Sequence, residues 1–207
     1  MVTRVPLGKL GSRTIQTLRT LDTLSKRITL DDLDRLESNM PYFVCVWSSS
    51  LALSQVVMPG DYLTAGTPVL ELGCGLGLVS AAACLKHARV TASDCQPDAL
   101  LFARMNCLQI AGTDPEVCVI DWADPPKDQK YMTLLCSDLV YDPLSYEPLI
   151  TCLETLLEPG GRVLLSEPNR EMGRLFFDRL DEVGWVYEEI SESDDVTVYS
   201  IQRAYKG

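Results

Sequence analysis

The chain has 207 residues and a formal net charge of −11 at pH 7, a length that suits one domain. Hydrophobic residues make up 46% and charged residues 23%, a balance that excludes disordered and collagen-like proteins. Its apolar runs are much shorter than the roughly 18 residues that cross a bilayer, and the start lacks a secretory signal pattern. We therefore expect a cytoplasmic protein without a membrane partner. Because an acidic surface repels phosphates, we also expect no nucleic-acid partner.

The first forty residues form a distinct segment, which we expect to be an arm or a small hairpin near Thr14–Leu24, ahead of the main domain at 41–207. Met1–Leu30 contains six basic residues and one acidic residue, although the chain as a whole is acidic. This composition also fits a mitochondrial targeting segment, which is the alternative for localisation.

Eight cysteines occur without a Cys-x-x-Cys pair, and His87 is the one histidine of the sequence. This set does not provide the ligand spacing of a zinc site, so we expect no metal. The cysteines are expected to be reduced, buried thiols that pack as small hydrophobic side chains.

From Pro68 onward, short apolar runs alternate with amphipathic stretches of helical length, a pattern typical of a mostly parallel sheet covered by helices. The fold class is therefore α/β, a doubly wound seven-stranded sheet with an antiparallel hairpin at its C-terminal end. Strands are expected near Val69–Leu72, Arg89–Ser93, Val117–Ile120, Met132–Ser137, Arg162–Ser166, Val186–Ile190 and Val196–Gln202. Helices are expected near Leu51–Val57, Leu78–Lys86, Pro97–Ile110, Pro143–Leu157 and Met172–Val183.

The strongest local signal is the glycine-rich turn Gly73-Cys74-Gly75-Leu76-Gly77, which follows a strand ending in Glu71-Leu72. Glycines allow the backbone to turn tightly and to approach a ligand. A dinucleotide fingerprint needs G-x-G-x-x-G, and Glu71 adds negative charge where a pyrophosphate would lie, so an NAD-dependent oxidoreductase is disfavoured. S-adenosylmethionine carries no phosphate and bears positive charge, which suits the loop and places Glu71 near its amino end.

Two further residues extend this cofactor hypothesis. Asp94 ends the second strand of this domain, where a carboxylate accepts hydrogen bonds from both ribose hydroxyls; the alternative is a cap of the helix beginning at Pro97. Asp121-Trp122 follows the third strand, where an acidic group and an indole can flank an adenine ring. The alternative for Trp122 is a hydrophobic cover on the sheet edge.

With these residues, and with Ser137-Asp138-Leu139-Val140-Tyr141 after the fourth strand, the chain resembles class I S-adenosylmethionine-dependent methyltransferases. It is most similar to their lysine methyltransferase-like family, which is marked by a D-x-x-Y motif, and the likeness spans about Pro41 to Trp185. The resemblance implies cofactor contacts from the residues Trp47, Gly73, Cys74, Gly75, Asp94, Trp122 and Ser137. It implies that Asp138 and Tyr141 shape the acceptor site. Ser48 replaces the proline that the family has after its tryptophan.

The resemblance implies a protein-lysine methyltransferase whose partner is a protein substrate, and we expect a monomer. Methyl transfer from a sulfonium needs no nucleophilic side chain, so such an enzyme acts mainly by holding donor and acceptor in line. A lysine acceptor must lose a proton first, because its ordinary pKa is about 10.4. A small-molecule N- or O-methyltransferase and a non-catalytic cofactor-binding scaffold remain alternatives. A nucleic-acid methyltransferase is disfavoured, because the Asp138–Tyr141 motif lacks the prolines that such enzymes carry there.

Overall fold

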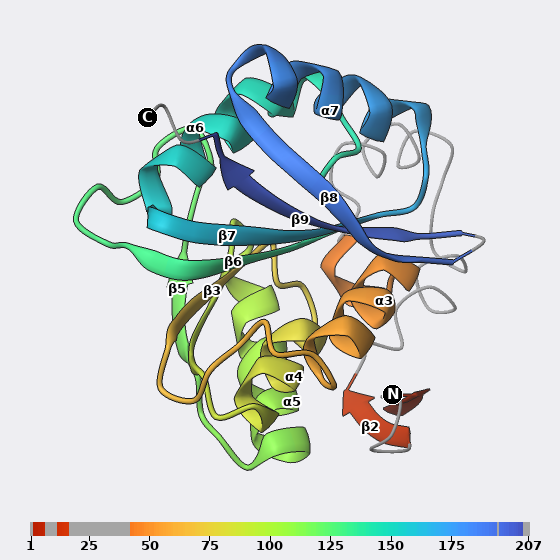
Figure 1. Ribbon diagram of the computed structural model, residues 1–207. Coiled ribbons are helices and arrows are strands. Elements are labelled where there is room, and N and C mark those ends of the chain that lie inside the picture. The colour runs from red at the N-terminus through yellow and green to blue at the C-terminus, as the bar shows by residue number, and fades with distance from the viewer. Residues whose placement is uncertain (1, 7–11, 17–41, 194, 205–207) are drawn as a thin grey trace, which may run out of the picture.

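The computed structural model describes residues 2–6, 12–16, 42–193 and 195–204, and a seven-stranded sheet forms its centre (Figure 1). The strands are β3 (Pro68–Leu72), β4 (Arg89–Asp94), β5 (Glu116–Val119), β6 (Tyr131–Ser137), β7 (Leu157–Glu167), β8 (Trp185–Glu192) and β9 (Thr197–Arg203). Their order is β5-β4-β3-β6-β7-β9-β8. Neighbours pair in parallel from β5 to β7, whereas β9 is antiparallel to both β7 and β8. The predicted fold class, including the C-terminal antiparallel hairpin, is confirmed.

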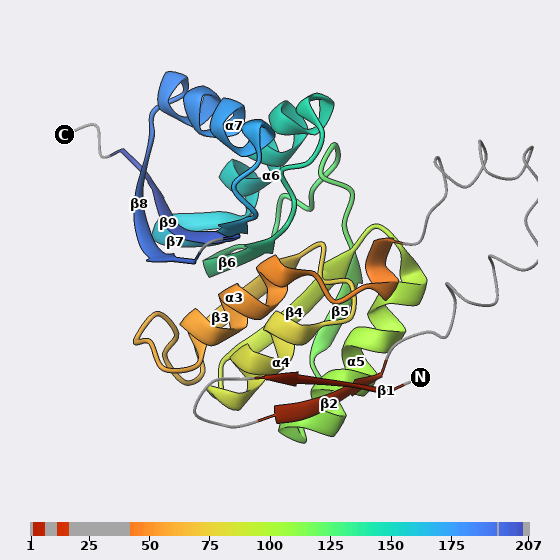
Figure 2. The same cartoon turned by 90° about the vertical axis from the view of Figure 1, so that its right-hand side faces the viewer.

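Helices cover both faces of the sheet (Figures 1 and 2). The helices α3 (Ser48–Val57), α4 (Leu78–Leu85) and α5 (Pro97–Ala111) lie on one face, and α6 (Tyr146–Leu156) and α7 (Glu171–Glu182) lie on the other. Leu134 and Leu135, which are adjacent in β6, belong to hydrophobic clusters on opposite faces. This is the two-residue alternation of a strand buried on both sides. Among the described residues, no helix has both the length and the apolar character needed to span a bilayer.

Several predicted boundaries differ from the structure. The helix expected at Pro143–Leu157 is a short 3₁₀ turn, η3 (Pro143–Ser145), followed by α6. The turn begins with Asp142, whose Oδ1 accepts a hydrogen bond from the Leu144 amide at 3.0 Å. A further 3₁₀ turn, η2 (Tyr42–Val44), precedes α3, which begins three residues earlier than expected.

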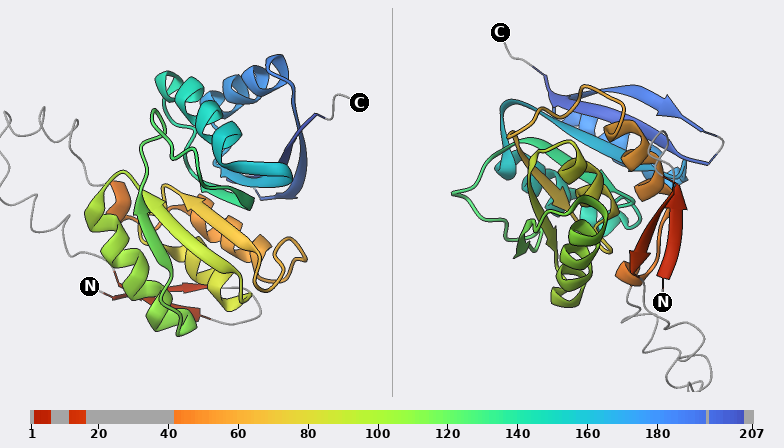
Figure 3. Two further views of the ribbon diagram at one scale, coloured as in Figure 1. Left: turned by 90° about the vertical axis from the view of Figure 1, so that its left-hand side faces the viewer. Right: turned by 90° about the horizontal axis from the view of Figure 1, so that it is seen from below.

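The N-terminal hairpin also lies earlier than predicted. Strand β1 (Val2–Pro6) pairs with β2 (Ser12–Gln16) in an antiparallel ladder that is separate from the main sheet. The backbone of β2 lies against α5 (Figures 2 and 3). Of the expected range Thr14–Leu24, residues 17–24 lie outside the described residues.

The helices α4 and α5 pack so closely that their contact requires glycine at the N-cap of α4. Gly77 has φ +71°, and a Cβ added to it would lie 2.6 Å from Ala103 Cα in α5. The Asn106 side chain supports the same contact by donating to the Leu76 carbonyl at 2.8 Å. The third glycine of the turn therefore serves helix packing.

This packing gives a stability prediction with a matched control. Gly112, at the end of α5, has a similar φ of +68° but no atom within 4 Å of an added Cβ. Gly112→Ala should therefore cost only the left-handed backbone strain, about 1–2 kcal/mol. Gly77→Ala should cost a further 1–3 kcal/mol, roughly, because the backbone of Ala103 must move. Urea unfolding of both variants measures the difference, and equal losses would contradict the packing argument.

Candidate active site

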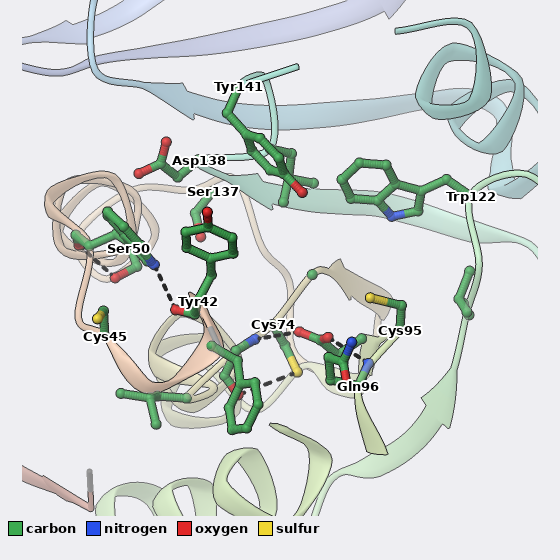
Figure 4. A pocket seen from close by; sticks show the side chains of 18 of the residues that line it. Tyr42, Cys45, Ser50, Cys74, Cys95, Gln96, Trp122, Ser137, Asp138 and Tyr141 are labelled. Atoms are coloured by element: carbon green, nitrogen blue, oxygen red, sulfur yellow. Dashed lines mark hydrogen bonds between the residues drawn. The ribbon is translucent and has the colours of Figure 1, made fainter. Parts of the chain in front are cut away.

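A cavity of about 560 Å³ opens at the carboxyl ends of β3, β4 and β6, within the size range of small-molecule sites. It lies where the sheet order changes direction between β3 and β6, the position at which doubly wound sheets bind ligands. Nine of the ten predicted site residues line it: Trp47, Gly73, Cys74, Gly75, Asp94, Trp122, Ser137, Asp138 and Tyr141. Figure 4 labels five of these residues around the cavity: Cys74, Trp122, Ser137, Asp138 and Tyr141.

The glycine-rich turn forms the floor of the cavity in a conformation that side chains hinder. Gly73 and Gly75 have φ of +60° and +50°, in the left-handed region that glycine adopts without strain. A Cβ on Gly73 would lie 2.7 Å from a methyl group of Leu139, and one on Gly75 would lie 3.4 Å from the Phe43 carbonyl oxygen. The bare backbone of this turn therefore forms a cradle that larger residues would fill.

Asp94 joins the turn to the end of β4. Its Oδ2 accepts a hydrogen bond from the Gly75 amide at 3.0 Å, and its Oδ1 accepts one from the Gln96 amide at 2.9 Å (Figure 4). A carboxylate has about four acceptor positions, so two remain for a diol. The N-cap of α5 is Gln96 and no side chain caps this helix, so Asp94 does not serve as the cap considered as an alternative, and it keeps acceptor capacity for ribose hydroxyls.

The structure corrects the expectation for Glu71, which does not face the cavity. Its side chain is buried, and its Oε2 accepts hydrogen bonds from the Ser80 amide at 2.7 Å and from the Ser80 hydroxyl. Burial raises the pKa of Glu71 to about 8, against which the two Ser80 hydrogen bonds act in the lowering direction. Glu71 therefore links β3 to α4 through Ser80 and does not line the cavity.

Aromatic side chains form the walls of the cavity. Trp122 packs against the hydrophobic cluster of the α6 and α7 face and lies beside Gly73. The indole of Trp47 donates to the Tyr42 carbonyl at 3.1 Å, and the two rings lie 6.5 Å apart. Tyr141 is 56% exposed, and its pKa is raised by partial burial and by the nearby Cys95 and Asp142. The Tyr141 hydroxyl is therefore neutral at physiological pH.

Asp138 lies at the rim, directly after β6 and above Ser137 and Tyr42 (Figure 4). Its backbone is left-handed, with φ +58°, and its amide donates to the Ser166 carbonyl at 3.0 Å. The carboxylate is 8% exposed and accepts a hydrogen bond from Arg170 Nη1 at 2.7 Å. The residue that caps η3 is Asp142, and Asp138 does not cap this turn.

Sequence reasoning missed Tyr42, Ser50, Cys95 and Gln96 among the residues that line the cavity. Tyr42 belongs to the same short segment as Trp47, and Cys95 and Gln96 follow Asp94, so proximity in sequence was the available signal. Cys95 is exposed, which corrects the expectation that all the cysteines are buried. Arg170 was missed as a partner of Asp138, because a pairing across 32 residues leaves no local pattern.

The donor set suits S-adenosylmethionine. The glycine cradle leaves room for a ligand against the backbone, and Asp94 has acceptor capacity for a ribose diol. Trp122 offers an indole face at the end of the cavity adjoining β5. A group of at least three histidine, cysteine or acidic side chains arranged to hold a metal does not occur among the described residues.

Comparisons with known proteins agree with this geometry. The model of a family described as lysine methyltransferase matches residues 28–183. The electron transfer flavoprotein beta subunit lysine methyltransferase of Danio rerio is 32% identical over 132 residues, 63% of this chain and 51% of that protein. A protein N-terminal and lysine N-methyltransferase of Cryptococcus neoformans is 29% identical over 184 residues, 71% and 62% respectively. The chain spans about half the length of the curated relatives it matches.

A solved structure supports the fold. The crystal structure of a glycopeptide N-methyltransferase complexed with S-adenosyl-L-methionine has a TM-score of 0.60 at 14% identity, covering 76% of this chain and 96% of that one. At this identity the likeness concerns the fold alone.

The buried carboxyl of Glu71 predicts a pH dependence of stability. With a folded pKa of about 8 against an ordinary value of 4.5, Glu71 keeps its proton in the folded state over a range where the unfolded chain releases it. The contribution of Glu71 to the free energy of unfolding is therefore complete below pH 4.5 and is lost as the pH rises to about 8. Glu71→Gln keeps an acceptor for Ser80 without a charge. Denaturant unfolding from pH 5 to 8 should show the variant gaining stability relative to the wild type by a few kcal/mol, and a constant difference would refute a raised pKa.

Proposed function

Because the chain belongs to the lysine methyltransferase family, we propose that it transfers a methyl group from S-adenosylmethionine to a lysine side chain of a protein. The observation that carries this proposal is that one cavity joins the glycine cradle and Asp94 to Asp138 and Tyr141. The proposed donor and acceptor sites therefore share one cavity. Transfer needs this arrangement, since its main requirement is that the reacting groups be held close and in line.

On the donor side, the backbone of Gly73–Gly75 would face the cofactor, and Asp94 would hold the ribose by its two remaining acceptor positions. Trp122 would offer its indole to the adenine. When bound, S-adenosylmethionine supplies an activated methyl group on a positively charged sulfur. Trp47 and Ser137, which line the cavity between the two sides, complete the contacts proposed for the cofactor.

On the acceptor side, Asp138 orients the lysine nitrogen and Tyr141 offers its ring face to a cationic side chain. The lysine must reach the cavity as a free amine, so its proton goes to solvent before transfer. The amine nitrogen would then take up the methyl group that bound S-adenosylmethionine supplies, and the electron pair of the broken carbon–sulfur bond would stay on sulfur. No side chain of the enzyme is consumed in this step.

The exposure of the rim supports a protein acceptor over a small molecule. Tyr42 and Tyr141 remain 55% and 56% exposed, so the acceptor end of the cavity reaches the surface, where a side chain from another protein can enter. The net charge of −11 favours approach by a protein surface rich in lysine. A small-molecule enzyme would be expected to enclose its acceptor more fully.

The donor assignment predicts the effect of removing Asp94. Asp94→Ala should weaken S-adenosylmethionine binding by about tenfold to a hundredfold, because two charge-assisted hydrogen bonds are lost. Isothermal titration calorimetry measures this loss. Asp98→Asn, an exposed carboxylate in the first turn of α5, is the control and should leave the affinity unchanged. Wild-type affinity in Asp94→Ala would exclude Asp94 from the cofactor site.

The acceptor assignment predicts that removing Asp138 lowers methyl transfer and leaves cofactor binding unchanged. Asp138→Ala should bind S-adenosylmethionine normally and lose methyl transfer by about a hundredfold or more. The measurement is the transfer of radiolabelled methyl from S-adenosylmethionine into a lysate that is separated into protein, nucleic-acid and small-molecule fractions. Wild-type label confined to the small-molecule fraction would refute the protein acceptor, and undiminished transfer by Asp138→Ala would remove its proposed role.

A further inference from the structure

Arg170 is the partner of the carboxylate that the proposed function assigns to the acceptor. Its Nη1 lies 2.7 Å from Asp138 Oδ1, and the two side chains are 39% and 8% exposed. Among the described residues, this is the one salt bridge that Asp138 makes. A nearly buried carboxylate without a cation would be costly, so the pair is a balanced unit whose members depend on each other.

The turn between β7 and α7 fixes the backbone from which Arg170 reaches. The Arg170 amide donates to Glu167 Oε1 at 2.9 Å, and the Gly173 amide donates to the Arg170 carbonyl at 3.0 Å. Asn169 has φ +54° and accepts a hydrogen bond from the Thr197 hydroxyl at 2.8 Å. A Cβ on Gly173 would collide with the Glu167 carboxylate. The turn is therefore built to hold one conformation, which points the Arg170 guanidinium at Asp138.

The charged and titratable groups around Asp138 come from several elements. Glu167 ends β7, and Arg170 lies at the N-cap of α7. Burial raises the pKa of Glu167, and the negative charge of Asp138 acts in the same direction. Tyr141 comes from the loop after β6 and Tyr42 comes from η2, and both line the same cavity as Asp138. Arg170 therefore supplies the positive charge that offsets Asp138.

This balance matters for the protonation state of the acceptor. A carboxylate near an amine favours the charged ammonium form and so raises the amine pKa. An ammonium nitrogen has no lone pair and cannot take up a methyl group. An unopposed Asp138 would thus bind lysine well in the form that does not react, whereas an Asp138 paired with a guanidinium can orient the nitrogen without stabilising its extra proton.

We propose that Arg170 is a positioning residue that neutralises Asp138, so that the acceptor lysine is received as its free amine. The inference rests on the proposed function and adds to it a residue outside the cavity lining. It also gives the turn Glu167–Arg170 a function, which is to hold Arg170 against Asp138.

The test is the pH dependence of kcat, measured with saturating S-adenosylmethionine and the acceptor protein recovered from the labelled lysate. In Arg170→Gln the acid limb should move to higher pH by about one pH unit, so that the rate near neutral pH falls about tenfold and recovers in alkaline buffer. Arg170→Lys keeps the charge and should restore most of the wild-type profile. Arg174→Gln is the control, because Arg174 forms exposed salt bridges with Glu171 and Asp178 on α7, and its profile should match the wild type.

A second comparison shows whether Arg170 acts through Asp138. In an Asp138→Asn background, Arg170→Gln should leave the pH profile where Asp138→Asn alone puts it. Arg170→Ala is the second variant should Arg170→Gln not fold, and calorimetry with S-adenosylmethionine checks that each variant keeps its cofactor affinity.

The outcomes separate this inference from the proposed function. A wild-type enzyme that labels protein, together with an Arg170→Gln profile that superimposes on it, overturns the role of Arg170 alone. A loss of rate that is equal at every pH also overturns it, because that pattern indicates lost geometry without a change in amine protonation. A wild type that binds S-adenosylmethionine but labels no protein overturns the proposed function, and the inference with it.

Discussion

The tight turn between β3 and α4 is the constraint on which the cavity depends. Its backbone is held from both sides by carboxylates: Asp94 accepts from the Gly75 amide, and Glu71 accepts from Ser80 in the first turn of α4. The contact of Gly77 with Ala103 then sets the distance between α4 and α5. Because these interactions hold strand ends and helix starts together, contacts within the chain fix the floor of the cavity, which reduces the ordering cost of binding.

The strand order brings the two halves of the site together. The proposed donor side is built on β3 and β4, and the proposed acceptor side is built on β6 and the turn that follows β7. Since β3 and β6 are neighbours in the sheet, residues 65 positions apart in sequence, such as Gly73 and Asp138, line one cavity. The acceptor half carries a paired charge at its edge, and the donor half carries a carboxylate with free acceptor positions. Each half is thereby suited to a different charge and a different ligand.

Much of the sheet and of the cavity lining was predictable, because the lining residues follow apolar strands. Alternation of apolar runs and amphipathic stretches located all seven strands of the main sheet, and residues after parallel strands meet at one edge. Glu71 does not line the cavity as expected, since the sequence does not distinguish a side chain that faces the cavity from one that turns to Ser80. Arg170 was missed because its contact with Asp138 joins segments far apart in the chain. The N-terminal hairpin begins earlier than the predicted range because short strands without a strong alternation carry little positional signal.

The proposed reaction is methylation of the side-chain nitrogen of a lysine in another protein. It is tested by mass spectrometry of the protein fraction after incubation of a lysate with the wild-type enzyme and S-adenosylmethionine carrying a deuterated methyl group. We expect deuterated methyl on the ε-nitrogen of one or a few lysines, and about a hundredfold less after incubation with Asp138→Ala. Deuterated methyl found on other residue types, or only on small molecules, would contradict it.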